Sequence, residues 1–396
     1  MILPISVMVA RDPNEPHRTA TPLELFFDLV YVVAVASAAS QFHHAIANHH
    51  LVSGFLSFSL AFFAIWLAWI NYTWFASAYD TRDTLFRVFS FIQIFGSLVF
   101  AVGIPDFFRE HPSYATGILG YVIMRIGLIL QWLRAAQGDE KRRNTCYRYA
   151  LSLTLIQFFW VAALFVPSRF EPFAIVSLVV LECLIAPFAE SYRSTSWHPH
   201  HIAERYGLFV IIVLGEGILG TTNALSGVHE ANGTWTLEML LFGFGTAALI
   251  FLLWGTYFKL PFGRFLEGKR TNQTAYAFGY AHFFVFAALT CVGVGLELVA
   301  DNLQSGEDPK HVASPLFTIL FLSTAIGIYL LTIAILRFLL FKQSNCNGLV
   351  FLNALFTPVV PVLAVYFGIS LPVGVMLSML APAIYIALTN LDGKAA

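Results

Sequence analysis

Residues 52–75 read VSGFLSFSLAFFAIWLAWINYTWF, a stretch of 24 residues without a charged side chain. A helix of about 20 residues crosses the hydrocarbon core of a bilayer, which is roughly 30 Å thick. The stretch is apolar throughout, whereas a barrel strand would alternate between apolar and polar side chains. It therefore predicts a transmembrane helix.

The composition of the whole chain agrees with this stretch. Of its 396 residues, 58% are hydrophobic and only 11% are charged, against about 25% charged in soluble domains. The 22 Lys and Arg residues balance 23 Asp and Glu residues, so no basic footprint for nucleic acid exists. The four cysteines form no C-x-x-C pair and predict neither a zinc site nor a disulfide framework.

Similar apolar stretches recur along the chain. Lipid offers no partner for backbone N–H and C=O groups, so each stretch is expected to be helical. We predict an all-α, polytopic membrane helix bundle of about twelve transmembrane helices. The expected limits are 22–41, 52–75, 85–104, 113–133, 147–166, 172–190, 203–222, 237–257, 275–299, 314–338, 348–367 and 370–390.

The basic residues predict the orientation, because Lys and Arg accumulate on the cytoplasmic side of a membrane. With the N-terminus inside, 18 of the 22 fall on the inner side and three on the outer side, while Arg125 lies within a span. Both termini are therefore expected to be cytoplasmic. The short connection at residues 367–371 leaves a second possibility, in which the last two spans form one re-entrant hairpin.

Weak internal matches predict a duplication. A shift of 200 residues places Cys146 on Cys346 and Pro172 on Pro372, and a shift of 180 places Glu24 on Glu204. An even number of helices per half gives both halves the same orientation, as in transporters built from parallel repeats. We expect a 6+6 parallel repeat, with a cytoplasmic segment at 1–21, a first half at 22–195 and a second half at 196–396.

Ionisable residues inside spans are costly, so each one calls for a partner or a function. Glu24 has a structural explanation, because Thr21-Pro22-Leu23-Glu24 reads as a capping box. Asp28 lies one turn deeper on the same helix face and lacks that explanation. We therefore take Asp28 as a functional candidate.

Three further charges are expected at a common depth. At 1.5 Å per helical residue, Arg125, Glu182 and Glu216 each lie roughly 15–18 Å from the ends of their spans. Buried charges at one depth are best explained by mutual pairing around a polar cavity. A purely structural triad and a triad lining a transport pathway both fit this pattern.

Glycines surround one member of this triad. Gly215, Gly217 and Gly220 flank Glu216, and they predict either an unwound turn of a transporter helix or close packing on a neighbouring helix.

A lone histidine, His282, lies inside the ninth span. It is either a hydrogen-bonded structural group or a proton carrier.

A structural ion pair that holds the loop in place, which we call the loop clamp, is expected before the third span. Asp83 and Arg87 have the i,i+4 spacing of a helical ion pair, with Asp80 one turn earlier. Four histidines in the first outer connection lack a nearby carboxylate or cysteine in the sequence, and we expect ordinary solvated or interfacial side chains; they are His43, His44, His49 and His50.

Three motifs carry a family resemblance: TPLELFFDLVYV at 21–32, WFASAYDTRD at 74–83 and HIAERYGLFVIIVLGE at 201–216. From residue 18 to the C-terminus the chain resembles the bacterial low temperature requirement protein A family. The resemblance implies a multi-pass inner-membrane protein whose name is tied to growth in the cold. Its motif positions are Glu24, Asp28, Asp80, Asp83, Glu204, Arg205 and Glu216, and His282 stands where the family favours a histidine.

Two functions from different classes fit these features. The first is a transporter for an ion or small solute; the second is a non-transporting membrane scaffold or sensor in cold adaptation. An enzyme is not expected, because no nucleophile–base pair or metal motif appears, and we expect no cofactor. The oligomeric state stays open. The candidate pathway residues are Asp28, Arg125, Glu182, Glu204, Arg205, Glu216 and His282, and the candidate structural caps or clamps are Glu24, Asp80, Asp83 and Arg87.

Overall fold

The computed structural model describes residues 5–16, 18–304, 313–341 and 347–392. All regular secondary structure in these ranges is helical. The first part of the chain holds α1 (Pro22–Ala47), α2 (Leu51–Tyr79), α3 (Thr84–Gly103), η1 (Ile104–Phe108), α4 (Ala115–Gly138), α5 (Arg143–Ala163) and α6 (Glu171–Glu190). The second part holds α7 (Pro199–Asn232), α8 (Leu237–Phe258), α9 (Phe262–Gly268), α10 (Asn272–Gln304), α11 (Pro315–Phe341), α12 (Asn347–Leu355), α13 (Val359–Tyr366), α14 (Leu371–Ser378) and α15 (Leu380–Asp392). The predicted all-α membrane bundle is confirmed.

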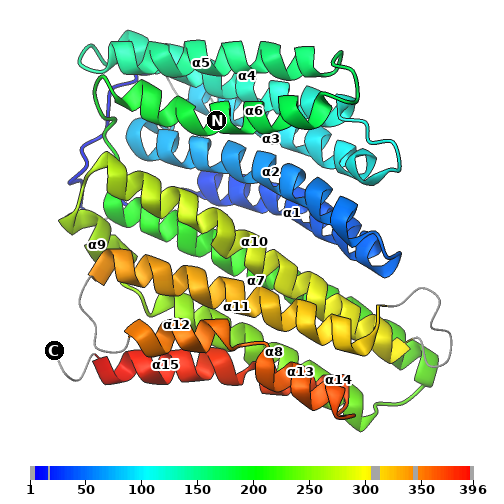
Figure 1. Cartoon of the computed structure of the whole chain (residues 1–396). Helices are drawn as coiled ribbons and strands as arrows, with labels where there is room; N and C mark the ends of the chain where they lie inside the picture. Colours follow the sequence, from blue (N-terminus) through cyan, green and yellow to red (C-terminus); the bar gives the residue numbers. More distant parts are fainter. Residues whose placement is uncertain (1–4, 17, 305–312, 342–346, 393–396) are drawn as a thin grey trace. The chain divides into compact units, whose positions relative to one another are not determined.

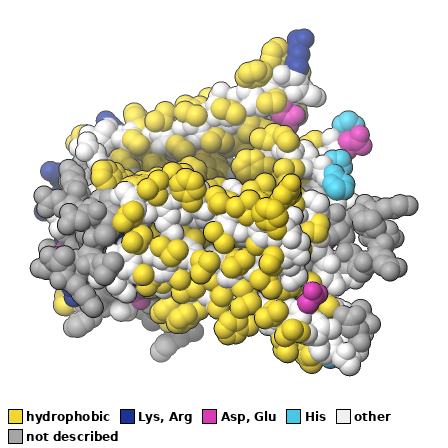
Figure 2. Space-filling view, turned by 60° about the horizontal axis from the view of Figure 1, so that its bottom comes forward, with side chains coloured by type: hydrophobic (Ala, Val, Ile, Leu, Met, Phe, Trp, Pro, Cys, Tyr) yellow, Lys and Arg dark blue, Asp and Glu magenta, His cyan; other side chains and the backbone are white. Residues whose placement is uncertain are grey.

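Eleven helices within the described ranges are long and apolar enough to cross a membrane, one fewer than predicted. The difference is α5, which forms close to its expected limits but does not reach the same apolarity. Polar side chains within it, among them Arg148 and Gln157, lower its mean hydropathy. Figure 2 shows hydrophobic side chains over much of one face, with the few charged and histidine side chains of that face near its margins.

The last two predicted spans are each broken into two helices. Pro358 directly precedes α13, and Pro382 lacks the N–H that would bond to the carbonyl of Ser378 at the end of α14. Gly368, between α13 and α14, has a φ of +89°, a conformation that glycine adopts without steric cost. The prolines thus divide stretches that are continuous by hydropathy alone, and the glycine lies in the connection between the two predicted spans.

The chain divides into two compact units. Unit 1 comprises Met1–Ala38, Leu60–Arg205 and Leu266–Tyr276, and unit 2 comprises Ala39–Ser59, Tyr206–Phe265 and Ala277–Ala396. The predicted 6+6 repeat, with halves at 22–195 and 196–396, stays a prediction.

Within unit 1, α3 packs on α4, α4 on α5 and α5 on α6 (Figure 1). The contact of α3 with α4 requires small residues, because a side chain at Gly120 would clash with the backbone of Phe100. Within unit 2, α8 packs on α14 and α15, and α11 packs on α12, α13 and α14.

Candidate functional site

The N-terminus of α1 carries the predicted capping box. The Thr21 backbone N–H donates to Glu24 Oε2 at 2.7 Å, and the Glu24 N–H donates to Thr21 Oγ1 at 3.3 Å. Together these bonds satisfy two backbone donors at the start of the helix. Glu24 is nevertheless more than a cap, because its side chain is fully buried and its other oxygen faces charged neighbours.

Arg205, in the second turn of α7, makes a two-pronged ion pair with Asp28. Its Nε and Nη2 donate to Asp28 Oδ2 and Oδ1 at 3.1 and 2.6 Å. Trp69 Nε1 on α2 donates to Asp28 Oδ1 at 2.6 Å, and Arg205 Nη2 also donates to Thr73 Oγ1 at 3.2 Å. Both charged side chains are fully buried, so two parallel bonds and added donors compensate for lost hydration.

Glu24 joins this pair to a second set of groups. Its Oε1 lies 3.1 Å from Arg205 Nη1, 3.0 Å from His201 Nε2 and 3.5 Å from Arg18 Nη2. Arg18 Nη2 in turn lies 3.8 Å from Asp80 Oδ2. A single continuous network therefore connects the segment before α1, the start of α1, the end of α2 and the start of α7.

We call this network the Glu24 cluster and define it as Arg18, Glu24, Asp28, Asp80, His201 and Arg205. Each of these side chains is at most 4% exposed, and all six lie in unit 1. The cluster draws Glu24 and Asp28 from the first motif, Asp80 from the second, and His201 and Arg205 from the third. The three motifs, far apart in sequence, thus meet at one place.

The cluster contains more acidic groups than permanent cations. Three carboxylates face two buried guanidinium groups, and His201 is the remaining titratable member. Asp80 has a further partner in Arg82, whose Nε lies 3.8 Å away and whose side chain is 57% exposed. Asp80 lies between two spans, and burial, together with the nearby Glu24 carboxylate, raises its pKa. Because solvent screens the exposed charge of Arg82, the six buried members are expected to reach neutrality by holding one proton on His201 or on a carboxylate.

A surface pocket of about 540 Å³ adjoins the cluster. Asp80 and the capping residue Thr21 line it, together with Arg82 and Arg87. Asp80 is therefore both a member of the buried cluster and part of the pocket wall. This position links the cluster to the end of the bundle at which α1 begins.

The expected ion pair between Asp83 and Arg87 is wrong. Asp83 caps α3 by accepting from the Phe86 N–H at 2.9 Å, and it forms a short ion pair with Arg134 of α4. It also accepts from the Ser6 N–H at 3.0 Å. Burial alone would raise the pKa of Asp83, but the hydrogen bond from Arg134 and two backbone donors hold it well below its usual range.

Arg125 and Glu182 form the buried pair that their depth predicted. Arg125 Nη2 lies 3.2 Å from Glu182 Oε2 and also bonds to the Tyr121 hydroxyl. The Tyr121 hydroxyl and Trp160 Nε1 each donate to Glu182 Oε1 at 3.1 Å. One cation and one carboxylate are thus matched and enclosed by two further donors.

Glu216 does not belong to this pair, so the predicted triad is wrong in its third member. Glu216 lies half-buried in unit 2, where its electrostatic neighbour is the carboxylate of Glu297. Helix α7 also continues unbroken through Gly215 and Gly217. A Cβ at Gly217 would lie 3.5 Å from the Cα of Gly293 on α10, which supports the packing explanation for the glycines.

A carboxylate partner exists for one of the outer histidines. His43 Nε2 lies 2.7 Å from Asp301 Oδ2, and His43 Nδ1 lies 3.9 Å from Glu297 Oε2. The expectation of an ordinary solvated or interfacial side chain is therefore wrong for His43, whose side chain is 13% exposed and ion-paired. The reason is tertiary, because α10 supplies both acids from more than 250 residues later in the chain.

His282 lies in a closed aromatic environment in unit 2. Its Nδ1 is 2.7 Å from the Phe278 carbonyl oxygen, and its Nε2 is 3.0 Å from the Tyr257 hydroxyl. The carbonyl can only accept, so Nδ1 carries a hydrogen and Nε2 accepts from the tyrosine in the neutral ring. Together with the rings of Tyr206 and Phe286, this geometry favours the structural explanation over proton handling.

Three residues differ from what the sequence predicted for the site. Glu204, a pathway candidate, accepts from the Ala20 N–H at 3.1 Å and is only partly buried, outside the Glu24 cluster. His201 and Arg18 were not among the candidates, although both belong to the cluster. The i,i+4 spacing of His201 and Arg205 places them on one helix face and is the signal that identifies His201.

No group of three or more potential metal ligands occurs among the residues described by the structure. The site consists instead of ion pairs enclosed by apolar helices.

The apolar spans and the buried ion pairs define a multi-pass α-helical membrane protein with charged groups held inside its helix packing. The family model of the bacterial low temperature requirement A protein (LtrA) matches residues 19–383, and the chain belongs to this family. The chain is similar to an uncharacterized protein of Rhizobium meliloti (strain 1021), with 29% identity over 405 residues that cover 98% of this chain and 94% of that protein. No solved structure matches the chain.

Proposed function

We propose that the protein is a transporter-like membrane protein for an ion or small solute, in which the Glu24 cluster holds an exchangeable proton. The observation that carries this proposal is the buried composition of the cluster: three buried carboxylates against two buried guanidinium groups and one histidine, with the third guanidinium, that of Arg82, 57% exposed.

An uncompensated charge in a low-dielectric interior costs several kcal/mol, so the cluster is expected to take up one proton to reach neutrality. Loss of that proton changes the net charge of the group formed by Glu24 and its three basic neighbours. Since Asp80 lines the adjoining pocket, we propose that the proton enters and leaves by this side.

The experiment is a proton-flux measurement on the full chain in liposomes. A pH gradient is imposed, inorganic ions and small solutes are supplied one at a time, and a trapped dye reports the inner pH. We expect a flux with at least one solute, reduced about tenfold or more by His201→Gln, which keeps a hydrogen-bond donor but does not titrate.

Glu140→Gln is the matched control, because Glu140 is 86% exposed and lies outside the cluster. Its flux should equal that of the unmodified protein. An unchanged flux in His201→Gln, with a folded variant, would rule out the proposed role of the cluster.

The rest of the assignment is part of the same proposal. We place the protein in the inner membrane of a bacterial cell with both termini in the cytoplasm, because 18 of 22 basic residues then fall on the inner side. We propose no enzymatic activity. Pathway roles for Arg125, Glu182, Glu204, Glu216 and His282 stay predictions.

A second candidate function is a non-transporting scaffold or sensor that supports growth in the cold. It is favoured by the distribution of the charged candidates, since the Glu24 cluster, the Arg125–Glu182 pair and the His282 environment each have their own partners. A His201→Gln protein that restores cold growth to a deletion strain, without proton flux in liposomes, would support this alternative over transport.

A further inference from the structure

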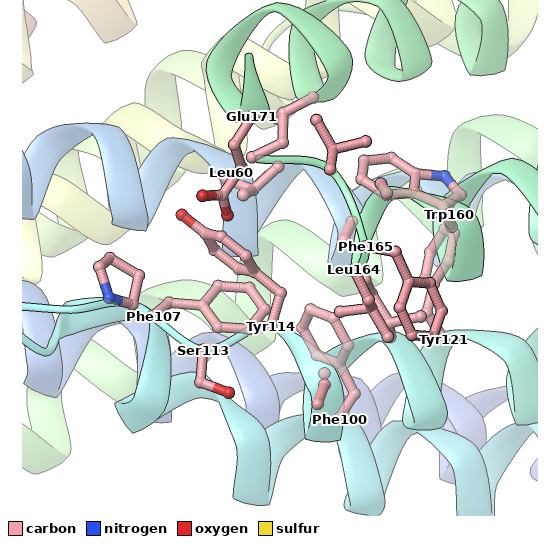
Figure 3. A pocket seen from close by; sticks show the side chains of 18 of the residues that line it. Leu60, Phe100, Phe107, Ser113, Tyr114, Tyr121, Trp160, Leu164, Phe165 and Glu171 are labelled. Carbon is pink, nitrogen blue, oxygen red and sulfur yellow. The ribbon is translucent and has the colours of Figure 1, made fainter. Parts of the chain in front are cut away.

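A second pocket, of about 430 Å³, lies within unit 1 between α2, η1, α4, α5 and α6. Its volume is in the range of small-molecule sites. Figure 3 shows that aromatic side chains from several of these elements surround it. It is separate from the Glu24 cluster, none of whose members lines it.

The rings of this pocket stand edge to face. Phe107 and Tyr114 have centroids 5.0 Å apart at 71°, Phe100 and Phe107 lie 5.9 Å apart at 85°, and Tyr121 and Trp160 lie 6.3 Å apart at 76°. In each of these pairs the two rings are nearly perpendicular, so their faces point in different directions around the pocket. Ring faces carry negative potential and attract cations.

The charge in the pocket is negative. Glu171, the first residue of α6, is the one charged side chain among the lining residues, and it makes no ion pair within the described part of the chain. Figure 3 shows its carboxylate pointing toward the Tyr114 side of the pocket. Burial, and then the charge of Glu171, raise the pKa of Tyr114, so the field of this carboxylate acts inside the pocket.

The buried cation that contacts the Tyr121 ring does not offset this charge. Arg125 lies behind the wall, 4.5 Å from the centroid of the Tyr121 ring, and it is paired with Glu182. Tyr121 and Trp160 both donate to Glu182, so their polar atoms are turned toward the ion pair. A ligand in the pocket therefore meets ring surfaces, aliphatic and serine side chains, and a single carboxylate.

We propose that this pocket binds a small organic cation of the alkylammonium type, with the aromatic rings around the cationic group and Glu171 as its counter-charge. An anion would be repelled by Glu171. A neutral molecule or a lipid chain would contact the rings but gain nothing from the carboxylate. The proposal concerns binding at equilibrium and does not rest on the proposed proton exchange.

The test measures binding of benzyltrimethylammonium to the full chain in nanodiscs by isothermal titration calorimetry. We expect saturable binding that is at least about tenfold tighter than that of neopentylbenzene, its uncharged isostere. Glu171→Gln should weaken binding of the cation about five- to tenfold, and Phe107→Leu, which keeps an apolar side chain but removes the ring, should weaken it similarly.

Glu110→Gln is the control, because Glu110 is exposed, lies two residues before the pocket residue Pro112 and does not line the pocket. Its affinity should equal that of the unmodified protein. Equal binding of the isostere would overturn the proposal in favour of an apolar occupant such as a lipid chain. The proposal would also be overturned by absent saturable binding, or by an affinity that Glu171→Gln leaves unchanged while the thermal unfolding of the variant stays normal.

Discussion

The Glu24 cluster and the Arg125–Glu182 pair are both ion sites of unit 1 with almost no solvent exposure, yet their composition differs. In the pair, one guanidinium meets one carboxylate, and Tyr121 and Trp160 supply the remaining donors. In the cluster, three carboxylates share two guanidinium groups and a histidine. The charges of the pair cancel, whereas the charges of the six buried cluster members cancel only with a proton, because the further partner of Asp80, Arg82, is largely exposed.

The comparison shows that burial alone does not separate a structural charge from a functional one. Both sites satisfy the rule that a buried charge needs a partner. What distinguishes them is the number of titratable groups that compete for the same cations. Substitutions that alter this number in one site and not in the other test the distinction.

The largest effect is expected from Arg205→Met. Asp28 and Glu24 would lose their shared cation while remaining buried, and such a loss costs about 3–5 kcal/mol. Thermal unfolding in detergent micelles measures it. Arg109→Met is the control, because the Arg109 side chain is 68% exposed and its partner Asp106 lies outside the cluster, and its unfolding should be nearly unchanged; equal midpoints for both variants would contradict the role of Arg205.

The second prediction concerns the complete pair. Glu182→Gln should destabilise the protein by about 3 kcal/mol, because Arg125 is left as a buried charge without a counter-charge. The double variant Arg125→Met, Glu182→Gln should recover most of that loss, since no buried charge remains. In the cluster, Arg205→Met with Asp28→Asn should recover much less, because Glu24 and His201 still face each other. Similar recovery at both sites would remove the distinction between them.

An intermediate effect is expected at the clamp before α3. Asp83→Asn keeps a helix cap but weakens the bond to Arg134, and we expect a loss of about 1–2 kcal/mol in the free energy of unfolding at pH 7. Because the folded state lowers the pKa of Asp83, its contribution is complete above the ordinary carboxyl pKa and fades as pH falls toward the lowered value. Arg87→Gln should have almost no effect, and a loss equal to that of Asp83→Asn would restore the pairing expected from sequence.

The smallest effect is expected from Asp80→Asn, which should stabilise the protein, whereas the preceding substitutions destabilise it. The folded state raises the pKa of Asp80 through burial and the Glu24 charge. Ionised Asp80 therefore weakens the fold, and this loss grows as pH rises through the ordinary carboxyl pKa toward the raised one. We expect Asp80→Asn to unfold about 1–3 °C higher than the unmodified protein at pH 8 and at the same temperature at pH 3. A lower midpoint at pH 8 would mean that the third carboxylate stabilises the cluster.

Local rules of the sequence predicted some elements well. The capping box of Thr21 and Glu24 depends only on residues three apart, and it formed as expected. Arg125 and Glu182 were paired correctly because depth within a span follows from residue number alone. The same arithmetic failed for Glu216, since depth does not say toward which neighbour a helix face is turned.

Apolar run length by itself determined that this chain is a helical membrane bundle, because a bilayer leaves backbone groups no partner other than those within a helix. The motif residues Glu24, Asp28, Asp80 and Arg205 were also visible in the sequence. Only the tertiary structure decided that they share one cluster with Arg18 and His201, and that Asp83 pairs with Arg134 in place of Arg87. The physical reason is that ion pairing depends on distances between helices, and helix packing sets those distances, whereas a sequence specifies only the spacing along each helix.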